Sequence, residues 1–148
     1  MMEITEVIEN KKQYFDLLVL ADEQEDMIDR YLDKGRMYIL DDNGVKCECI
    51  VTDEGNGVLE IKNIATVPEY QGKGYAKSLI DYIVKKYREE YAVLQVGTGD
   101  SPLTMPFYEK CGFVRSHIIP NFFTDNYDHL IYEGGVQLVD MVYLQRPL

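Results

Sequence analysis

The sequence contains few cysteines, and their spacing excludes two kinds of structural site. Only three cysteines occur in 148 residues. Cys47 and Cys49 alternate within an expected strand and Cys111 precedes a glycine, so no C-x-x-C pair is formed. An odd count without that spacing gives neither a disulfide framework nor a zinc site. We therefore expect three buried, reduced thiols and no metal.

Long apolar stretches are also missing. No run of about 18 apolar residues exists, which excludes a membrane-spanning helix. The first residues, Met1 to Glu6, lack the basic and apolar blocks of a signal peptide. These absences predict a cytoplasmic protein with no membrane partner. The length and the ordinary apolar content fit one domain, residues 1–148, around one core.

Positive charge is scarce. Lys and Arg number 15 against 26 Asp and Glu, which gives a net charge of −11. Nucleic acid is a poor partner for such a surface, because its binding depends on neutralising phosphates with cations. A cationic substrate would be steered favourably. Solubility of an acidic enzyme explains the same charge equally well, so both explanations stay open.

Hydrophobic periodicity predicts an α/β (α+β) protein with a mixed sheet of about seven strands and about four helices. Strands are expected at 3–9, 36–41, 45–52, 58–67, 92–96, 113–119 and 136–144. Helices are expected as two pieces within 11–34, at 74–87, and as a short helix that ends at Cys111 with Gly112 as its cap. Asp42-Asn43-Gly44 and Asn56-Gly57 are hairpin signals.

Three segments carry further expectations. Strand 58–67, helix 74–87 and strand 92–96 favour a parallel strand pair in the centre of the sheet. Pro106 would remove a hydrogen bond inside the last helix, so that helix should be short or bent. Residues 120–135 are long and aromatic for a connection, and we expect either a lid on the substrate side or a loop packed against the sheet.

The stretch from Val67 to Lys77 joins the strand at 58–67 to the helix at 74–87. A glycine-rich turn at a helix N-terminus presents unpaired N–H groups and the positive end of the helix dipole, which favours a phosphate. A Walker loop needs Ser or Thr after Gly-Lys, but Gly74 follows Lys73. The dinucleotide fingerprint needs Gly or Ala at its last position, which Lys77 occupies.

What remains is Gln71-x-x-Gly74-x-Ala76, followed downstream by Phe107-Tyr108-Glu109-Lys110-Cys111-Gly112-Phe113. This combination, with the order of the elements along essentially the whole chain, resembles the GNAT superfamily of acyl-CoA N-acyltransferases. The resemblance implies the GNAT fold, a central parallel strand pair that splays at a bulge, and acetyl-CoA as co-substrate. It implies transfer of an acetyl group to an amine.

The resemblance also implies which residues bind acetyl-CoA. Backbone groups of the strand before the loop would bind pantetheine and polarise the acetyl carbonyl, and the loop would cradle the pyrophosphate. Asp100 stands where many relatives carry Asn, so it keeps an acceptor but loses a donor. The residues so assigned are Ile64, Ala65, Thr66, Gln71, Gly72, Lys73, Gly74, Tyr75, Ala76, Lys77 and Asp100.

Two catalytic roles follow from the resemblance. Tyr108 matches the usual general acid, which protonates the leaving thiolate. Glu60 matches the base of the histone-acetylating branch, whereas Gln95 stands where some relatives carry a Glu and cannot accept a proton usefully. Glu60 could instead be a strand carboxylate that only pairs with Lys62. In that case a relay of water molecules would carry the proton of the amine to the surface.

The acceptor is less constrained. None of the cysteines has an activating base, so we expect direct attack in a ternary complex rather than an acetyl-enzyme. Asp125, Asp128 and Glu133 in the connection favour a cationic small-molecule amine. A protein N-terminus or lysine is the alternative acceptor, and a non-catalytic acyl-CoA sensor is the alternative class. A C-terminal apolar strand could pair with a second copy, so a homodimer stays open.

Overall fold

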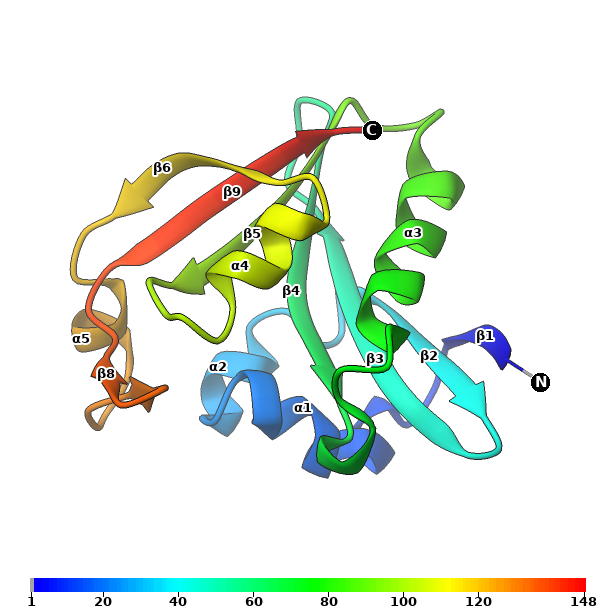
Figure 1. Ribbon diagram of the computed structural model, residues 1–148, viewed down its shortest axis with the longest axis horizontal. Helices are drawn as coiled ribbons and strands as arrows, with labels where there is room; N and C mark the ends of the chain where they lie inside the picture. Colours follow the sequence, from blue (N-terminus) through cyan, green and yellow to red (C-terminus); the bar gives the residue numbers. More distant parts are fainter. Residues whose placement is uncertain (1) are drawn as a thin grey trace.

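The computed structural model describes residues 2–148, and one seven-stranded sheet organises them (Figure 1). The strand order is β1-β2-β3-β4-β5-β9-β6, and every neighbouring pair is antiparallel except β4 and β5. The strands are β1 Met2–Val7, β2 Arg36–Asp42, β3 Val45–Asp53, β4 Val58–Thr66, β5 Val93–Gly99, β6 Val114–Ile119 and β9 Met141–Pro147. The predicted mixed sheet with a central parallel pair is confirmed.

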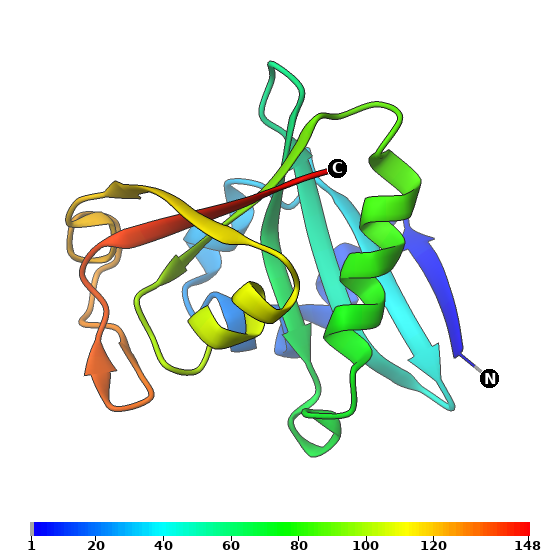
Figure 2. The ribbon, with the colours of Figure 1, turned by 45° about the horizontal axis from the view of Figure 1, so that its top comes forward.

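Helices cover both faces of this sheet (Figures 1 and 2). They are α1 Phe15–Ala21, α2 Glu25–Asp29, α3 Tyr75–Tyr87, α4 Met105–Lys110 and α5 Phe122–Asn126, with 3₁₀ turns at Lys11–Tyr14 and Pro68–Tyr70. α3 and α4 share one buried cluster with alternate residues of β2, among them Tyr38 and Leu40. α1 and α2 pack on the other face, against Met37 and Ile39. No helix among the described residues is long and apolar enough to cross a membrane.

Helix α3 forms where the apolar stripe predicted it. Leu79, Ile80 and Ile83 are fully buried and Tyr87 is nearly so, which places one face of the helix on the sheet. Full burial of each such side chain contributes about 1.5–3 kcal/mol. The helix therefore fixes the loop that precedes it against β3 and β4.

Both predicted hairpin turns are present. Asn43 and Gly44 have φ values of 57° and 112°, and Asn56 and Gly57 have 55° and 77°. Positive φ at both central positions matches the twist of the flanking strands, and Asn and Gly tolerate it best. The three-strand meander β2-β3-β4 follows from these turns.

The end of the chain differs from the prediction. The expected strand 136–144 is wrong in its bounds, because Val136–Gln137 (β8) pairs with Tyr132–Glu133 (β7) in a separate small sheet. The expected loop 120–135 contains α5. Residues 139 and 140 hold α5 instead of a strand: the Phe123 N–H donates to the Val139 carbonyl at 2.9 Å, and the Asn121 N–H donates to Asp140 Oδ1 at 2.9 Å.

The parallel pair separates midway, as the resemblance implied. β4 and β5 pair only over Val58–Ile61 and Val93–Val96. In the β3–β4 ladder, residue 50 pairs with residue 63 and residue 51 with residue 61, so Lys62 is the extra residue of a bulge. Beyond this bulge, β4 continues to residue 66 and β5 to residue 99, but the two strands no longer pair with each other. β5 thus includes residues 97–99, which the sequence predicted as loop.

Candidate functional site

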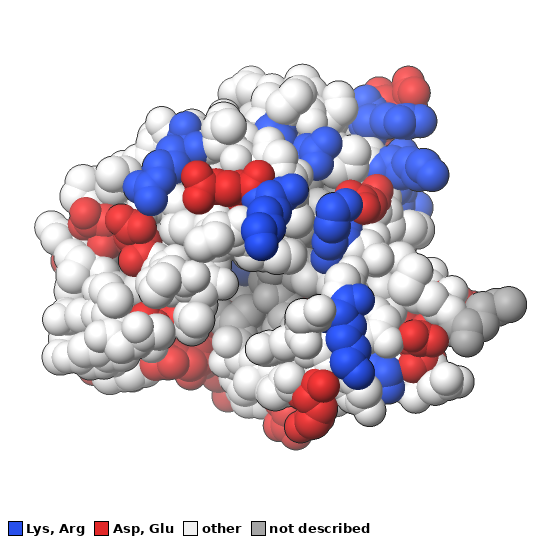
Figure 3. Space-filling model, viewed as in Figure 1, with Lys and Arg blue, Asp and Glu red and all other residues white. Residues whose placement is uncertain are grey.

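A cavity of about 760 Å³ lies where β4 and β5 diverge. Its walls come from the ends of both strands, the loop before α3, helix α4, the α1–α2 linker and the segment from Phe123 to Met141. Figure 3 shows a hollow near the centre of the face that carries α3 and α4, with Lys and Arg side chains along its upper and right rim. The cavity has the size of a typical small-molecule site.

Backbone groups of β4 face the gap between the strands. The Val67 N–H donates to the Lys46 carbonyl at 2.8 Å, so in the antiparallel ladder residues 65 and 63 also bond to β3. Ile64 and Thr66 alternate with them and present their N–H and C=O groups to the gap. The Thr66 carbonyl accepts a hydrogen bond from Gln71 Nε2 at 3.3 Å. Ala65 also lines the cavity, but its backbone groups belong to the β3 ladder.

The loop before α3 presents free amides. Within residues 2–148, the N–H groups from Gly72 to Lys77 have no protein acceptor, and the first bonded one is Ser78, which donates to the Gly74 carbonyl at 3.0 Å. Gly72 and Gly74 have φ values of 79° and 86°. A Cβ on either glycine would meet no atom within 4 Å. The loop is therefore an open cradle of amides at the positive end of a helix, which suits an anion.

Nine of the eleven residues assigned to acetyl-CoA line this cavity. They are Ile64, Ala65, Thr66, Gln71, Gly72, Gly74, Tyr75, Ala76 and Lys77. Lys73 lies outside the lining, with its Nζ 5.4 Å from the centre of the Tyr70 ring. Asp100 also lies outside, on a side chain that is 65% exposed and pairs with Arg115 at 3.3 Å.

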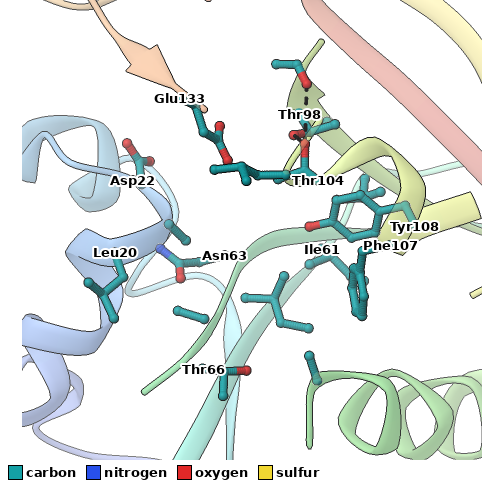
Figure 4. Close-up of a pocket in the computed structure, with 18 of the residues that line it drawn as sticks. Leu20, Asp22, Ile61, Asn63, Thr66, Thr98, Thr104, Phe107, Tyr108 and Glu133 are labelled. Carbon is teal, nitrogen blue, oxygen red and sulfur yellow. Dashed lines mark hydrogen bonds between the residues drawn. The ribbon is translucent and has the colours of Figure 1, made fainter. Parts of the chain in front are cut away.

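Tyr108 reaches the same cavity from α4. Its ring packs edge-on against Phe107 and Phe113, with centroids 5.2 and 5.8 Å away, and Figure 4 shows its hydroxyl directed into the cavity. No residue from 2 to 148 forms a hydrogen bond with this hydroxyl that would occupy it. Burial raises the pKa of Tyr108, so the phenol stays a neutral proton donor at neutral pH.

The ends of α4 fix the position of Tyr108. Gly112 has a φ of 92°, its N–H donates to the Glu109 carbonyl at 3.1 Å, and the Phe113 N–H donates to the Tyr108 carbonyl at 3.1 Å. This is the Schellman arrangement, and it confirms Gly112 as the cap. Pro106 sits in the first turn, where its missing N–H would have no partner in any case. The helix is short, as predicted.

Glu60 lies on the opposite face of β4 and does not line the cavity that contains Tyr108. Only 4% exposed, it accepts a hydrogen bond from Gln95 Nε2 at 2.5 Å and pairs with Lys62 Nζ at 2.8 Å. The Tyr143 hydroxyl donates to Glu60 Oε2, the oxygen that pairs with Lys62, at 3.4 Å. Glu60 lines a smaller cavity of about 280 Å³ that shares Ile61, Lys62 and other walls with the larger one.

The segment 122–133 closes the cavity on the side of α1 and α2. Its contacts with the α1–α2 region are Tyr127 to Asp22 at 2.7 Å, Asp128 to Gln24 at 3.0 Å, His129 to Glu23 at 2.8 Å, and Arg30 to Asn126 at 3.2 Å. The segment is therefore packed against the α1–α2 region, and its Phe123 and Ile131 also share a buried cluster with Met141 at the start of β9. We call these four contacts the strap.

Sequence reasoning missed several residues at this end of the cavity. Asp22 and Asn63 both line it, together with Leu20 and Thr104. Burial raises the pKa of Asp22 and, among the acids named from the sequence, that of Glu133. No local pattern marks Asp22, because its partners lie 9 and 105 residues away.

The three cysteines are buried and free, which confirms the expectation of reduced thiols. Residues 2–148 contain no group of three or more His, Cys, Asp and Glu side chains arranged to hold a metal ion.

Comparison with known proteins gives consistent matches. The family model described as an acetyltransferase (GNAT) domain matches residues 33–115. An uncharacterised N-acetyltransferase of Bacillus subtilis (strain 168), YvbK, is 35% identical, over 95% of this chain and 92% of that protein.

Solved structures agree over the full length. A GNAT family acetyltransferase from Elizabethkingia anophelis with acetyl-CoA bound is 32% identical, with a TM-score of 0.93 over 99% of this chain and 98% of that one. A Bacillus subtilis acetyltransferase in complex with CoA is 33% identical, with a TM-score of 0.89 over 100% and 99%.

Proposed function

Since this chain belongs to the GNAT acetyltransferase family, we propose that it moves the acetyl group of acetyl-CoA to a primary amine by direct attack in a ternary complex. The observation that carries the proposal is the run of free amides from Gly72 to Lys77, beside a gap lined by unpaired backbone groups of β4. CoA and acetyl-CoA are bound in the similar solved structures.

In this proposal the loop holds the diphosphate and the gap holds pantetheine. The glycines let the backbone approach the phosphates, and the amides donate to them without a charged side chain. Ile64 and Thr66 supply the strand-like hydrogen bonds that pantetheine needs. Lys77 also lines the cavity beside the loop, but its Nζ pairs with Asp81 at 2.9 Å, so the amides remain the main donors to the phosphates.

The chemical steps follow from this placement. A primary amine has a pKa of about 10.4 and must lose a proton before it attacks the thioester carbonyl. The carbon–nitrogen bond forms as the carbonyl becomes an oxyanion, which gap-facing N–H groups of β4 stabilise. The carbon–sulfur bond then breaks, and Tyr108 donates its proton to the thiolate.

Glu60 is the proposed base, and water is its relay. Its carboxylate lines the smaller cavity, which shares Ile61 and Lys62 with the larger one, so a proton can pass between the two sides of β4 through water. The ion pair with Lys62 and the hydrogen bond from Gln95 hold the Glu60 carboxylate in place at that cavity.

The strap favours a small acceptor over a protein. Four polar contacts join segment 122–133 to the α1–α2 region and close the cavity on that side. A lysine or N-terminus carried by a folded protein would need a groove that admits backbone on both sides of the residue. A free amine needs only the cavity itself, and the carboxylates at that end favour a cation.

Two measurements test the proposal. Titration calorimetry with CoA should give heat and a one-to-one complex, and free-thiol release should be seen with acetyl-CoA and small primary amines. Absence of CoA binding would end the proposal. Tight CoA binding with no thiol release over amines or peptides would instead indicate an acyl-CoA sensor.

A further inference from the structure

Asp22 is a half-buried carboxylate held by two phenols. Tyr31 donates to its Oδ2 at 2.9 Å, and Tyr127 donates to its Oδ1 at 2.7 Å. Tyr31 follows α2 and Tyr127 belongs to segment 122–133, so the carboxylate is fixed from two sides. Each oxygen keeps a further lone pair for a ligand, because a carboxylate offers about four acceptor sites.

Asp22 forms no ion pair with Lys, Arg or His among residues 2–148. Its hydrogen-bond donors are the two phenols and the Gln24 N–H, and the charge of Arg30 reaches it only through space. Glu133, which lines the same cavity, has neither a hydrogen bond nor an ion pair among these residues. Two carboxylates without an ion pair at one end of a cavity favour a ligand that brings positive charge.

Asn63 supplies an independent sign of a missing ligand. It is 2% exposed, and its Nδ2 donates to the Leu18 carbonyl at 3.0 Å and to the Tyr31 hydroxyl at 3.1 Å. Because a carbonyl only accepts, the orientation of the amide is fixed. Oδ1 is then left buried without a partner on a residue that lines the cavity. What Oδ1 lacks is an N–H or O–H donor.

Figure 4 shows Asp22 and Tyr108 on opposite sides of the cavity, with Asn63 between Asp22 and Ile61. A nitrogen bound at Asp22 is therefore not the one that attacks beside Tyr108. An ammonium held by a carboxylate also keeps its proton, so it cannot act as the nucleophile.

We propose that Asp22, Asn63 and Glu133 form a seat for a second, non-reacting ammonium group of the acceptor. The preferred acceptors are then molecules with at least two amino groups, of the diamine or polyamine class. This inference rests on the proposed function and adds the substrate class. Asp22 binds the charge, Asn63 Oδ1 accepts one of its N–H groups, and Tyr31 and Tyr127 position the carboxylate.

The kinetic test compares matched amines. Unbranched α,ω-diamines of three to eight carbons and n-alkylamines of the same lengths are assayed by thiol release at saturating acetyl-CoA. The best diamine should exceed its alkylamine at least about tenfold in kcat/KM, through a lower KM. In Asp22→Asn this ratio should fall toward one. Asp33→Asn removes the same charge from an exposed residue outside the cavity and should keep the ratio.

Two results overturn the seat. One is a wild-type enzyme that prefers no diamine at any chain length, and the other is an unchanged ratio in Asp22→Asn. If Asp22→Asn fails to fold, Glu133→Gln replaces it, because this side chain has no protein partner to lose. Its ratio should also fall, and an unchanged ratio there counts against the seat.

A binding test separates the seat from the reaction. The thermal stability of the CoA complex is measured with the same diamines and alkylamines. Diamines should raise the melting temperature more than alkylamines in the wild type, and this difference should vanish in Asp22→Asn. Absence of thiol release would overturn the proposed function, whereas equal effects of both amine classes would overturn the seat alone.

Discussion

Tyr108 combines a fixed ring with a free hydroxyl, which is the arrangement a proton donor needs. Its ring contacts with Phe107 and Phe113 do not involve the oxygen, so Tyr108→Phe should leave the fold and CoA affinity unchanged. The loss of the acid should lower kcat by about 10²–10⁴. Steady-state thiol release and calorimetry with CoA measure the two effects.

A matched control is available for that variant. Tyr91→Phe also removes a phenol, one that donates to Asp53 at 3.0 Å outside the cavity, and it should keep full activity. If Tyr108→Phe retained more than about a tenth of the wild-type kcat, Tyr108 would not be the general acid and solvent would have to protonate the thiolate.

Glu48 is a second residue whose surroundings make a prediction. It is fully buried on β3, neither carboxyl oxygen meets a donor at bonding geometry, and burial raises its pKa well above the usual range. In the unfolded chain Glu ionises near its ordinary pKa of about 4.3. Above that pH the unfolded state binds fewer protons than the folded state, so Glu48 lowers stability as the pH rises.

Glu48→Gln should therefore raise the melting temperature at pH 8 by more than at pH 5. A tenfold difference in proton affinity between the two states is worth about 1.4 kcal/mol, or about 3 °C for a chain of this size. Scanning calorimetry at both pH values measures it, with the exposed Glu25→Gln as the control. A variant that is less stable by the same amount at both pH values would show that Glu48 is ionised in the folded state.

At the scale of elements, the loop before α3 depends on two glycines with positive φ. Gly74→Ala would strain the backbone by about 1–2 kcal/mol and would place a methyl group in the open space above the amides. We expect at least about tenfold weaker CoA binding, because a diphosphate must approach these amides closely. Calorimetry with CoA measures the change.

Gly55→Ala is the matched control for this variant. Gly55 has a φ of 83°, also has no atom within 4 Å of an added Cβ, and lies in the β3–β4 turn outside the cavity. Both variants should lose similar stability, but only Gly74→Ala should lose CoA affinity. Equal affinity in the two would show that the loop does not hold the diphosphate.

The elements that the sequence predicted well are those with local causes. The apolar stripe of α3, the Asn-Gly turns and the glycine-rich loop each depend on residues within one or two turns of chain. The failures lie where distant residues decide. Strand 136–144 was misplaced because residue 139 bonds to residue 123. Asp22 and Asn63 were missed because their partners lie 9 to 105 residues away, beyond any local pattern.

At the scale of the whole molecule, the net charge of −11 would act in opposite directions on acetyl-CoA and on the proposed cationic acceptor. Acetyl-CoA is an anion, so it depends on the local cradle and on the Lys and Arg side chains around the hollow in Figure 3. A cationic acceptor is instead drawn by the field of the entire surface. Added salt screens this long-range attraction and should therefore lower kcat/KM for a cationic acceptor.

The charge on the acceptor gives that attraction a quantitative signature. Coulomb energy scales with the product of the charges, so a diamine should be about twice as sensitive to salt as an alkylamine. The measurement is kcat/KM for both amines at saturating acetyl-CoA, from about 0.01 M to about 0.15 M ionic strength, over which the Debye length shrinks from about 30 to about 8 Å. Both values should fall, with the steeper slope for the diamine. If Asp22→Asn removes the diamine preference but leaves its steeper slope, the seat and the surface field act separately. Equal slopes for the two amines would mean that the negative surface plays no part in choosing the acceptor and serves solubility alone.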